Sequence, residues 1–313
     1  MVLATVDLAR FEAAEGAERA ELAAEVDRIC WETGFLVLAG HGVPDQVIDG
    51  VWQAAEGFFA QPPEAKARVA PPNPGDPYGW LGPNTEALAK SRGEETPPDL
   101  KESFNGGPAS VPEGLTDKDA LAFCYAPTPW PDLPGFEAAW RSYYAEMERL
   151  AGRVMAMFAA ALGLPEDFFA PHIDAPISAL RALHYPATGD AAELGQQRAG
   201  AHSDYGSLTI LLPQPGSRGL EIEAPGGGWA EVVPVPGTFV INIGDLMARW
   251  TADRWVSTLH RVVAHPNQPA RKSLAFFHQP NWFAEIAPLD GSDAYPPVHS
   301  GPYLMEKFRA TGA

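Results

Sequence analysis

The sequence has few cysteines and no long run of apolar residues, and each absence excludes a class of protein. Cys30 and Cys124 are its only cysteines, far apart and outside any Cys-x-x-Cys spacing. This excludes a disulfide framework and a structural zinc site built on cysteines. No segment approaches the roughly 18 consecutive apolar residues of a membrane span, and the N-terminus lacks the basic and apolar parts of a secretory signal. We therefore expect a cytoplasmic protein.

Positive charge is also scarce. The chain carries 22 Lys and Arg residues against 40 Asp and Glu residues, which gives a formal net charge of −18 and a pI near 4.8. A surface of this charge repels nucleic acids and anionic membranes. We expect neither as a partner, whereas the oligomeric state has no signature in the sequence.

Proline and glycine, by contrast, are abundant. Together they make up 62 of the 313 residues, roughly a fifth of the chain where about 12% is usual. Three segments nevertheless have apolar residues at helical spacing, and we expect helices over residues 16–30, 44–61 and 137–162, with a short strand over residues 34–44.

Residues 71–135 contain thirteen prolines and little periodicity. We expect this stretch either to cover a site as a lid or to wrap around the core.

The second half of the chain has a different character. From Ser178 onward, seven short β-like runs separated by Gly and Pro follow one another, at spacings of roughly 8 to 15 residues. This pattern indicates a sandwich or barrel, and a jelly roll in particular. The expected fold class is mainly β with flanking helices.

A histidine and a carboxylate two residues apart occur twice, at His172-x-Asp174 and at His202-x-Asp204. Composition alone produces roughly one such triplet in a chain of this length, so the triplet by itself carries little information. In a strand, residues i and i+2 point to the same face, and either pair could present both groups to one ion. The first pair lies between prolines, whereas the second leads directly into an apolar β-like run. We therefore expect a rigid strand to hold the second pair.

Two histidines and one carboxylate on one face of a metal leave three positions open, which is typical of non-haem Fe(II) oxygenases. The third ligand would have to be another histidine. His260 stands in a β-branched run after a predicted strand and could reach the same face. The other candidates lie beside prolines or at loop edges: His184, His265, His278 and His299.

The order and spacing of these motifs resemble the plant-type, isopenicillin-N-synthase-like family of Fe(II)/2-oxoglutarate oxygenases. His202-x-Asp204 is followed after 55 intervening residues by His260, and Arg271-x-Ser273 begins eleven residues later. The resemblance covers nearly the whole chain and includes the segments GFLVLAGHGVP, DLKESF, NPGDPYGWLGPNTEAL, LRALHYP, VINIGDLMARWT and HRVV.

The resemblance implies a double-stranded β-helix, or jelly roll, that binds Fe(II) through His202, Asp204 and His260. An N-terminal α/β region and a long helix would brace this core. The implied division of the chain is an N-terminal non-haem dioxygenase region (1–125), a linker with the bracing helix (126–176), the jelly-roll core (177–285) and a C-terminal extension (286–313).

The resemblance also implies a site for 2-oxoglutarate. Arg271 and Ser273 would hold its far carboxylate, Tyr185 would donate a hydrogen bond to that carboxylate, and Asn242 would lie beside the site. A planar guanidinium suits this task better than a lysine does. For the walls of the substrate pocket, we expect the following side chains: Phe104, Leu220 and Phe277.

The chain departs from the family pattern in two places. It has Leu183 and His184 where many plant members carry the first two residues of an Asn-Tyr-Tyr-Pro run, which puts one cosubstrate contact in doubt. It has Ala252 where asparagine is common. We expect the second change to affect the structure of a loop and not the chemistry.

The implied activity is Fe(II)- and 2-oxoglutarate-dependent oxygenation by O2. 2-Oxoglutarate would be converted to succinate and CO2 while a C–H bond of a small organic metabolite is hydroxylated or desaturated. One alternative is an oxidase of the same fold that needs no 2-oxoglutarate and uses Arg271 and Ser273 to hold the carboxylate of its substrate. A more distant alternative is a noncatalytic jelly-roll binding protein.

Overall fold

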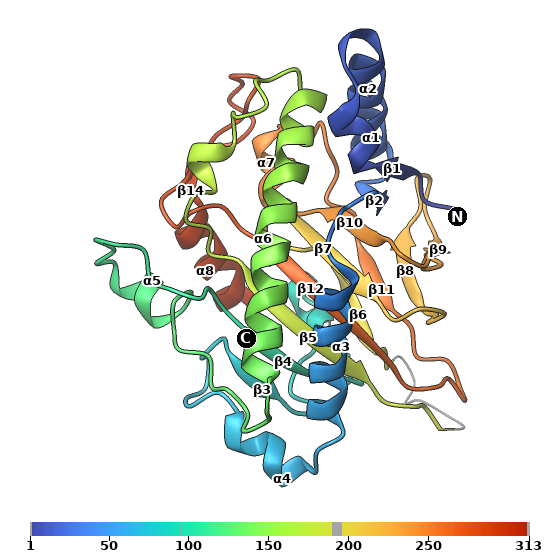
Figure 1. Ribbon diagram of the computed structural model, residues 1–313, viewed down its shortest axis with the longest axis vertical. Helices are drawn as coiled ribbons and strands as arrows, with labels where there is room; N and C mark the ends of the chain where they lie inside the picture. The colour runs from blue at the N-terminus through green and yellow to red at the C-terminus, as the bar shows by residue number, and fades with distance from the viewer. Residues whose placement is uncertain (1, 95, 190–195, 312–313) are drawn as a thin grey trace.

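Two facing β-sheets form the centre of the protein (Figure 1). The computed structural model describes residues 2–94, 96–189 and 196–311. The larger sheet contains, in spatial order, β1 (Thr5–Asp7), β2 (Phe35–Ala39), β10 (Phe239–Ile243), β7 (Leu208–Pro213), β12 (Arg271–His278), β5 (Ala179–Tyr185), β4 (Glu102–Gly106) and β3 (Gly79–Leu81). The smaller sheet contains β6 (Ala199–His202), β11 (His260–Val262), β8 (Leu220–Glu223) and β9 (Trp229–Glu231). The expected jelly-roll core with flanking helices is confirmed.

Helices cover the outer face of the larger sheet. In Figure 1 the long helix α6 (Phe136–Ala161) runs along this face, with α3 (Asp45–Phe59) beside it. Together with α2 (Gly16–Glu32) and α7 (Asp245–Trp250) they bury the main apolar cluster against the strands. The helices expected over residues 16–30, 44–61 and 137–162 are thus present, with ends shifted by one or two residues. The remaining short helices are α1 (Leu8–Ala13), α4 (Pro63–Lys66), η1 (Ala67–Val69), η2 (Leu88–Arg92), α5 (Lys118–Ala122) and η3 (Ala170–His172).

The two-residue repeat of the strands separates the core from the interior of the jelly roll. In β12, Leu274 and Phe276 pack into the cluster under the helices. Ser273, Ala275 and Phe277 point the other way and line a cavity between the two sheets. Strands β5, β7 and β10 alternate in the same manner, because successive side chains of a strand point to opposite faces.

The structure corrects the expectation for Phe104. Phe104 is fully buried on the helix side of β4, where its ring lies 5.0 Å from that of Phe58 and 5.1 Å from that of Trp140 between centroids. It is not part of the cavity lining. Its neighbour Asn105 points to the cavity instead, since adjacent residues of a strand face opposite sides.

Residues 71–135, apart from residue 95, contribute both to the larger sheet and to the wall of the cavity. Strand β4 belongs to the larger sheet, between β3 and β5, and so forms part of the core. Residues 75–78, 85–88 and 123–124 line the cavity.

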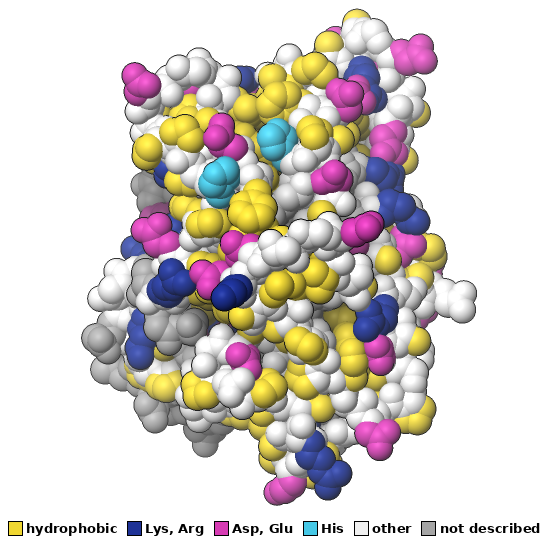
Figure 2. Space-filling view, turned by 90° about the vertical axis from the view of Figure 1, so that its left-hand side faces the viewer, with side chains coloured by type: hydrophobic (Ala, Val, Ile, Leu, Met, Phe, Trp, Pro, Cys, Tyr) yellow, Lys and Arg dark blue, Asp and Glu magenta, His cyan; other side chains and the backbone are white. Residues whose placement is uncertain are grey.

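The C-terminal helix α8 (Ser300–Thr311) also borders the cavity, through Leu304 and Phe308. It follows the small ribbon of β13 (Glu285–Ile286) and β14 (Val298–His299). With α5 it forms a separate apolar cluster. On the face that these helices occupy, charged side chains of both signs are scattered among apolar ones (Figure 2). None of the helices in the described part of the chain combines the length and the apolarity needed to cross a lipid bilayer.

The departure at Ala252 affects backbone conformation. Ala252 lies just after α7 and has a φ of +52°, in the left-handed region. Asparagine tolerates this region better than alanine does. The substitution therefore costs conformational energy in a turn, as expected, and does not reach the cavity lining.

The position of Phe104 generates a stability prediction. Phe104→Ala should lower the free energy of unfolding by about 3–5 kcal/mol, because it removes a fully buried ring from the main cluster. Urea unfolding followed by fluorescence measures this. Phe277→Ala is the matched control, since Phe277 is only partly buried and borders the cavity, and its loss should be clearly smaller. Equal losses for the two variants would contradict the assignment of Phe104 to the core.

Candidate active site

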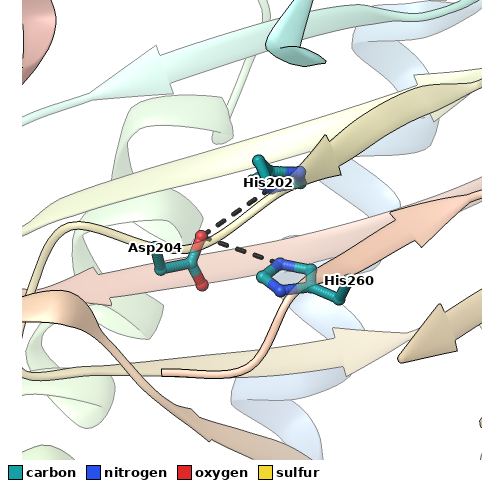
Figure 3. Close-up of side chains that lie close together, drawn as sticks. All are labelled: His202, Asp204 and His260. Carbon is teal, nitrogen blue, oxygen red and sulfur yellow. Dashed lines mark ion pairs between the residues drawn. The ribbon is translucent and has the colours of Figure 1, made fainter. Parts of the chain in front are cut away.

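Three side chains converge at one point between the two sheets (Figure 3). His202 is the last residue of β6 and His260 the first residue of β11, and the two are paired across the smaller sheet. Asp204 lies in the connection between β6 and β7. Its Oδ1 atom is 3.8 Å from Nε2 of each histidine. Within the described ranges, this is the only cluster of at least three His, Cys or carboxylate side chains with the spacing of a metal site.

The histidine rings are oriented by the backbone. Nδ1 of His202 lies 2.7 Å from the carbonyl oxygen of Gly200, and Nδ1 of His260 lies 3.2 Å from that of Thr258. Since a carbonyl oxygen can only accept, each Nδ1 carries the proton and each Nε2 keeps its lone pair free. Both lone pairs are therefore available on the side of Asp204.

The carboxylate of Asp204 is held at its other oxygen. Oδ2 accepts hydrogen bonds from the Thr209 hydroxyl at 2.5 Å and from the Asn242 side-chain amide at 2.7 Å. Asn242 thus contacts a triad residue. Sequence reasoning missed Thr209, although the two-residue repeat of β7 places it on the cavity face. These bonds leave Oδ1 free for an ion.

Burial and neighbouring groups set the charges of the triad. Burial and the neighbouring His260 together lower the pKa of His202 to about 3, although Asp204 acts in the opposite direction, so the imidazole is neutral. Burial by itself would raise the pKa of Asp204, but the two imidazoles and the bonds from Thr209 and Asn242 lower it. A neutral imidazole and an ionised carboxylate are the forms that bind a divalent metal.

The local backbone differs from the expectation that one strand carries both His202 and Asp204. β6 ends at His202, and the chain then crosses to β7 in the other sheet. The crossing is fixed by hydrogen bonds: the Asp204 carbonyl accepts from the Asp245 amide at 2.7 Å, and the Ser207 amide donates to the His278 carbonyl at 3.1 Å. Rigidity at Asp204 therefore comes from α7 and β12 and not from a strand of its own.

A cavity of about 840 Å³ contains the triad at its wall and runs along β12 and β5. Thr209, which bonds Asp204, is paired with Phe277 near the end of β12. Arg271 and Ser273 lie four to six residues away at the start of the same strand, a separation on the order of 10–20 Å. The cavity thus has a cationic end, formed by Arg271, Ser273 and Tyr185, that is well separated from Phe277.

The cationic end has the polar atoms that a carboxylate needs. Arg271 is paired with Tyr185 across β12 and β5, and its guanidinium carbon lies 5.0 Å from the centre of that ring. Nε of Arg271 and Oγ of Ser273 are buried and have no hydrogen-bond partner among the described residues. Buried donors of this kind are normally satisfied. A carboxylate placed between them would accept from both.

The two remaining predicted walls, Leu220 and Phe277, both line the cavity. Leu220 lies near the cationic end, because Arg271 donates to the carbonyl of Arg218, two residues before it, at 3.4 Å. Phe277 lies at the level of the triad. The two side chains therefore border different parts of the cavity.

The structure also contains a cluster of charged side chains near the triad, which the sequence did not predict. Arg181 lines the cavity and donates to Asn105 Oδ1 at 2.7 Å and to the carboxylate of Glu86 at 3.1 Å. Lys101 bonds Asp99 at 2.9 Å and lies 3.5 Å from Glu86. Burial opposes ionisation of Glu86, but Arg181 and Lys101 lower its pKa to about 2. This network ties Glu86 and Asp99 to strands β4 and β5.

The second triplet, His172-x-Asp174, has a structural role. The His172 ring packs edge-on against Trp250 at 5.3 Å between centroids, and Asp174 accepts a hydrogen bond from Asn281 at 2.5 Å. Neither residue lines the cavity. The two triplets have the same spacing in the sequence, but only His202 and Asp204 lie beside a third possible metal ligand, His260, among the described residues.

Comparisons with known proteins agree with this geometry. The chain matches the family model "non-haem dioxygenase in morphine synthesis N-terminal" over residues 3–133 and that of the 2OG-Fe(II) oxygenase superfamily over residues 176–280. It is 36% identical to validamycin A dioxygenase of Streptomyces hygroscopicus subsp. limoneus, over 96% of this chain and 84% of that protein. The chain belongs to the 2-oxoglutarate- and Fe(II)-dependent oxygenase family.

Solved structures support the same assignment for this oxygenase. A full-length protein of Neurospora crassa in complex with alpha-KG superimposes with a TM-score of 0.86 at 29% identity, covering 98% of this chain and 95% of that one. A second complex of the same Neurospora crassa protein, with alpha-KG and thymine, gives a TM-score of 0.85 at 29% identity, over 99% of this chain and 97% of that one. The oxygenase uses Fe(II) as its cofactor and 2-oxoglutarate as its cosubstrate.

A buried histidine supports the connection that carries Asp204. Nδ1 of His278, at the end of β12, lies 2.7 Å from the Ser207 hydroxyl, and that hydroxyl is 3.0 Å from the His278 carbonyl. His278 is 1% exposed, and burial lowers its pKa to about 4. In the folded protein this imidazole is therefore neutral at neutral pH.

This burial predicts a pH dependence of stability. Between a pH of about 6.5 and a pH of about 4, unfolded His278 binds a proton that the folded residue does not, so stability falls as the pH falls. The loss from this one group should be about 2 kcal/mol between pH values of about 7 and about 5. Urea unfolding of the metal-free protein at the two pH values measures it. His278→Asn should show a smaller loss over this interval, and an unchanged loss would exclude His278 as its source.

Proposed function

We propose that His202, Asp204 and His260 bind the Fe(II) of this oxygenase. The observation that carries this assignment is that each of the three side chains has one polar atom bonded to the protein and one polar atom free. Backbone carbonyls accept hydrogen bonds from Nδ1 of each histidine, and two side-chain donors bond Oδ2 of Asp204. The atoms left over, two Nε2 and one Oδ1, converge on one point. This is the two-histidine, one-carboxylate arrangement that leaves positions for further ligands.

We propose that the cationic end binds the far carboxylate of 2-oxoglutarate. Nε of Arg271 and Oγ of Ser273, which have no hydrogen-bond partner among the described residues, would donate to this carboxylate. The Tyr185 hydroxyl would donate to it as well. Leu220 borders this end and would pack against the cosubstrate. The separation between Arg271 and the level of the triad favours a ligand with an anionic group at each end.

Within this site the protein acts mainly by orientation. Bound Fe(II) supplies the redox chemistry that couples conversion of 2-oxoglutarate and O2 to succinate and CO2 with oxidation of a C–H bond. Thr209 and Asn242 fix the Asp204 carboxylate, and the carbonyls of Gly200 and Thr258 fix the imidazole rings. Such supporting bonds hold reacting groups in a productive geometry and thereby lower the barrier.

We propose that the substrate binds near Phe277, between the triad and the aromatic and apolar side chains that line this part of the cavity. Phe123, Ile177 and Leu304 line this region together with the polar Arg181. A small metabolite with an apolar part and a hydrogen-bonding group fits such a lining, and its hydroxylation or desaturation is the proposed reaction. Proline hydroxylase buaE, 32% identical to this chain, and the Neurospora crassa protein bound to thymine are relatives with small polar ligands.

We propose that the protein works in a reducing compartment such as the cytoplasm. Its two cysteines, Cys30 and Cys124, are free and buried, as is usual in such a compartment. The acidic charge argues against nucleic acid as a partner. We further propose the division into residues 1–125, 126–176, 177–285 and 286–313, in which the first segments brace the jelly roll and the last borders the cavity.

The ligand assignment predicts the effect of two matched substitutions. His202→Ala should abolish Fe(II) binding in an anaerobic titration and abolish activity, because it removes one of three protein ligands. His172→Ala, which alters the other His-x-Asp triplet, should bind one Fe(II) as the wild type does. Full Fe(II) occupancy in the His202 variant would contradict the assignment.

The cosubstrate assignment predicts strict coupling and a role for Arg271. Succinate should form in step with O2 uptake in the wild type, and no O2 should be consumed without 2-oxoglutarate. Arg271→Gln should weaken 2-oxoglutarate binding roughly 10- to 100-fold, since it removes a charged hydrogen-bond donor. Calorimetric titration of the Fe(II) protein measures the change. Turnover without 2-oxoglutarate would instead favour an oxidase that holds the carboxylate of its substrate.

A further inference from the structure

A second arginine is buried behind the cationic end. Arg198 directly precedes β6 and is 1% exposed. Its Nη2 atom donates to the carbonyl of Pro186 at 2.9 Å and to that of Pro269 at 2.7 Å. Pro186 follows Tyr185 in the chain, and Pro269 precedes Arg271 by two residues. The guanidinium of Arg198 is therefore fixed beside the point where Tyr185 and Arg271 are paired.

Neither arginine at this end has an anionic partner among the described residues. In the part of the chain that the structure describes, no carboxylate lies within ion-pair distance of Arg198 or Arg271, and Nε of each is buried without a hydrogen-bond partner. Burial lowers the pKa of both, and the charge of Arg271 lowers that of Arg198 further, while Tyr185 acts in the opposite direction on each. Two like charges in one buried region are costly unless an anion compensates them.

Arg198 is not part of the cavity lining, whereas Arg271 is. The two bonds to backbone carbonyls hold Arg198 in place but leave its charge uncompensated, because a carbonyl is a neutral acceptor. Its charge therefore acts through space on whatever occupies the cationic end. In a region sheltered from water, such an interaction is screened much less than at the surface.

We propose that Arg198 is a positioning residue for the cosubstrate, a second buried cation that makes the cationic end selective for a 2-oxo dicarboxylate over a 2-oxo monocarboxylate. The inference rests on the proposed cosubstrate site. Arg271 contacts the far carboxylate, and Arg198 adds the positive potential that favours its ionised form. A ligand that lacks this carboxylate has no favourable interaction with Arg198 and leaves both cations uncompensated.

Two probes of equal chain length separate this effect from a loss of structure. 2-Oxovalerate has the five carbons of 2-oxoglutarate but ends in a methyl group where 2-oxoglutarate has its far carboxylate. We expect Arg198→Gln to weaken binding of 2-oxoglutarate to the Fe(II) protein roughly tenfold or more, and to change binding of 2-oxovalerate by less than about twofold. Arg198→Lys keeps the charge and should restore most of the preference for 2-oxoglutarate. Anaerobic calorimetric titration measures both affinities in the holoprotein.

Arg141→Gln is the matched control, because Arg141 is an exposed arginine that pairs with Glu137 on α6. It removes one positive charge from the surface and should leave both affinities unchanged. Arg198→Met preserves the aliphatic part of the side chain and serves as the neutral variant if the glutamine variant does not fold. Thermal unfolding of the ligand-free variants reports the separate, structural contribution of the two carbonyl bonds.

The possible results separate a failure of the Arg198 proposal from a failure of the proposed cosubstrate site. If neutral variants of Arg198 bind both probes with wild-type affinity, or weaken both equally, Arg198 only supports the backbone and the inference is wrong. If the wild type itself fails to bind 2-oxoglutarate, the proposed cosubstrate site is wrong, and the inference about Arg198 is wrong with it. A loss confined to 2-oxoglutarate supports the inference.

Discussion

The two-residue repeat of a β-strand is the constraint on which the rest of this structure depends. The larger sheet is covered by helices on one face and opens to the jelly-roll interior on the other, so each of its central strands serves two purposes at once. In β12, Leu274 and Phe276 secure the sheet to the helices, while Arg271 and Ser273 face the cavity from the same strand. A shift of one residue in register would exchange the two sets. The apolar core thus fixes the position of the polar site.

In the proposed metal site, hydrogen bonds to atoms that would not bind the metal orient the three side chains that would. Each histidine and the carboxylate of Asp204 has one polar atom bonded to the protein and one directed at the common point. The supporting groups come from both sheets: Thr209 and Asn242 belong to the larger sheet, and Gly200 to the smaller. The geometry of the proposed metal site therefore depends on how the sheets face each other, and not only on the residues that flank it.

Charge is distributed unevenly along the cavity. Near the triad, Arg181 and Lys101 are balanced by Glu86 and Asp99 in a closed network. At the cationic end, Arg271 is not balanced by any described carboxylate. Because an unbalanced buried charge is stable only with a counterion, the two regions differ in what they can bind: the cationic end favours an anion, and the region near Phe277 favours a ligand with little net charge.

Much of this arrangement could be predicted from the sequence, because it is encoded in local patterns. The apolar periodicity of residues 137–162 gave a helix, the β-like runs after Ser178 gave a jelly roll, and the spacing from His202 to Arg271 identified the family. Other features depend on residues that meet only in the folded chain. The role of Phe104 was predicted wrongly, since its face of β4 is set by pairing with β5. The alternation of β7 indicates the face on which Thr209 lies but not its bond to Asp204, and Arg198 carries no local signal at all.

The sequence by itself thus determined which side chains could form a metal site and in what order they occur. Tertiary structure decided where Asp204 is supported, what role the second His-x-Asp triplet has, and that Arg198 lies beside Arg271 at the cationic end. The physical reason is that the spacing of residues along a strand is local, whereas hydrogen bonding between sheets and the balance of buried charge depend on segments far apart in the chain.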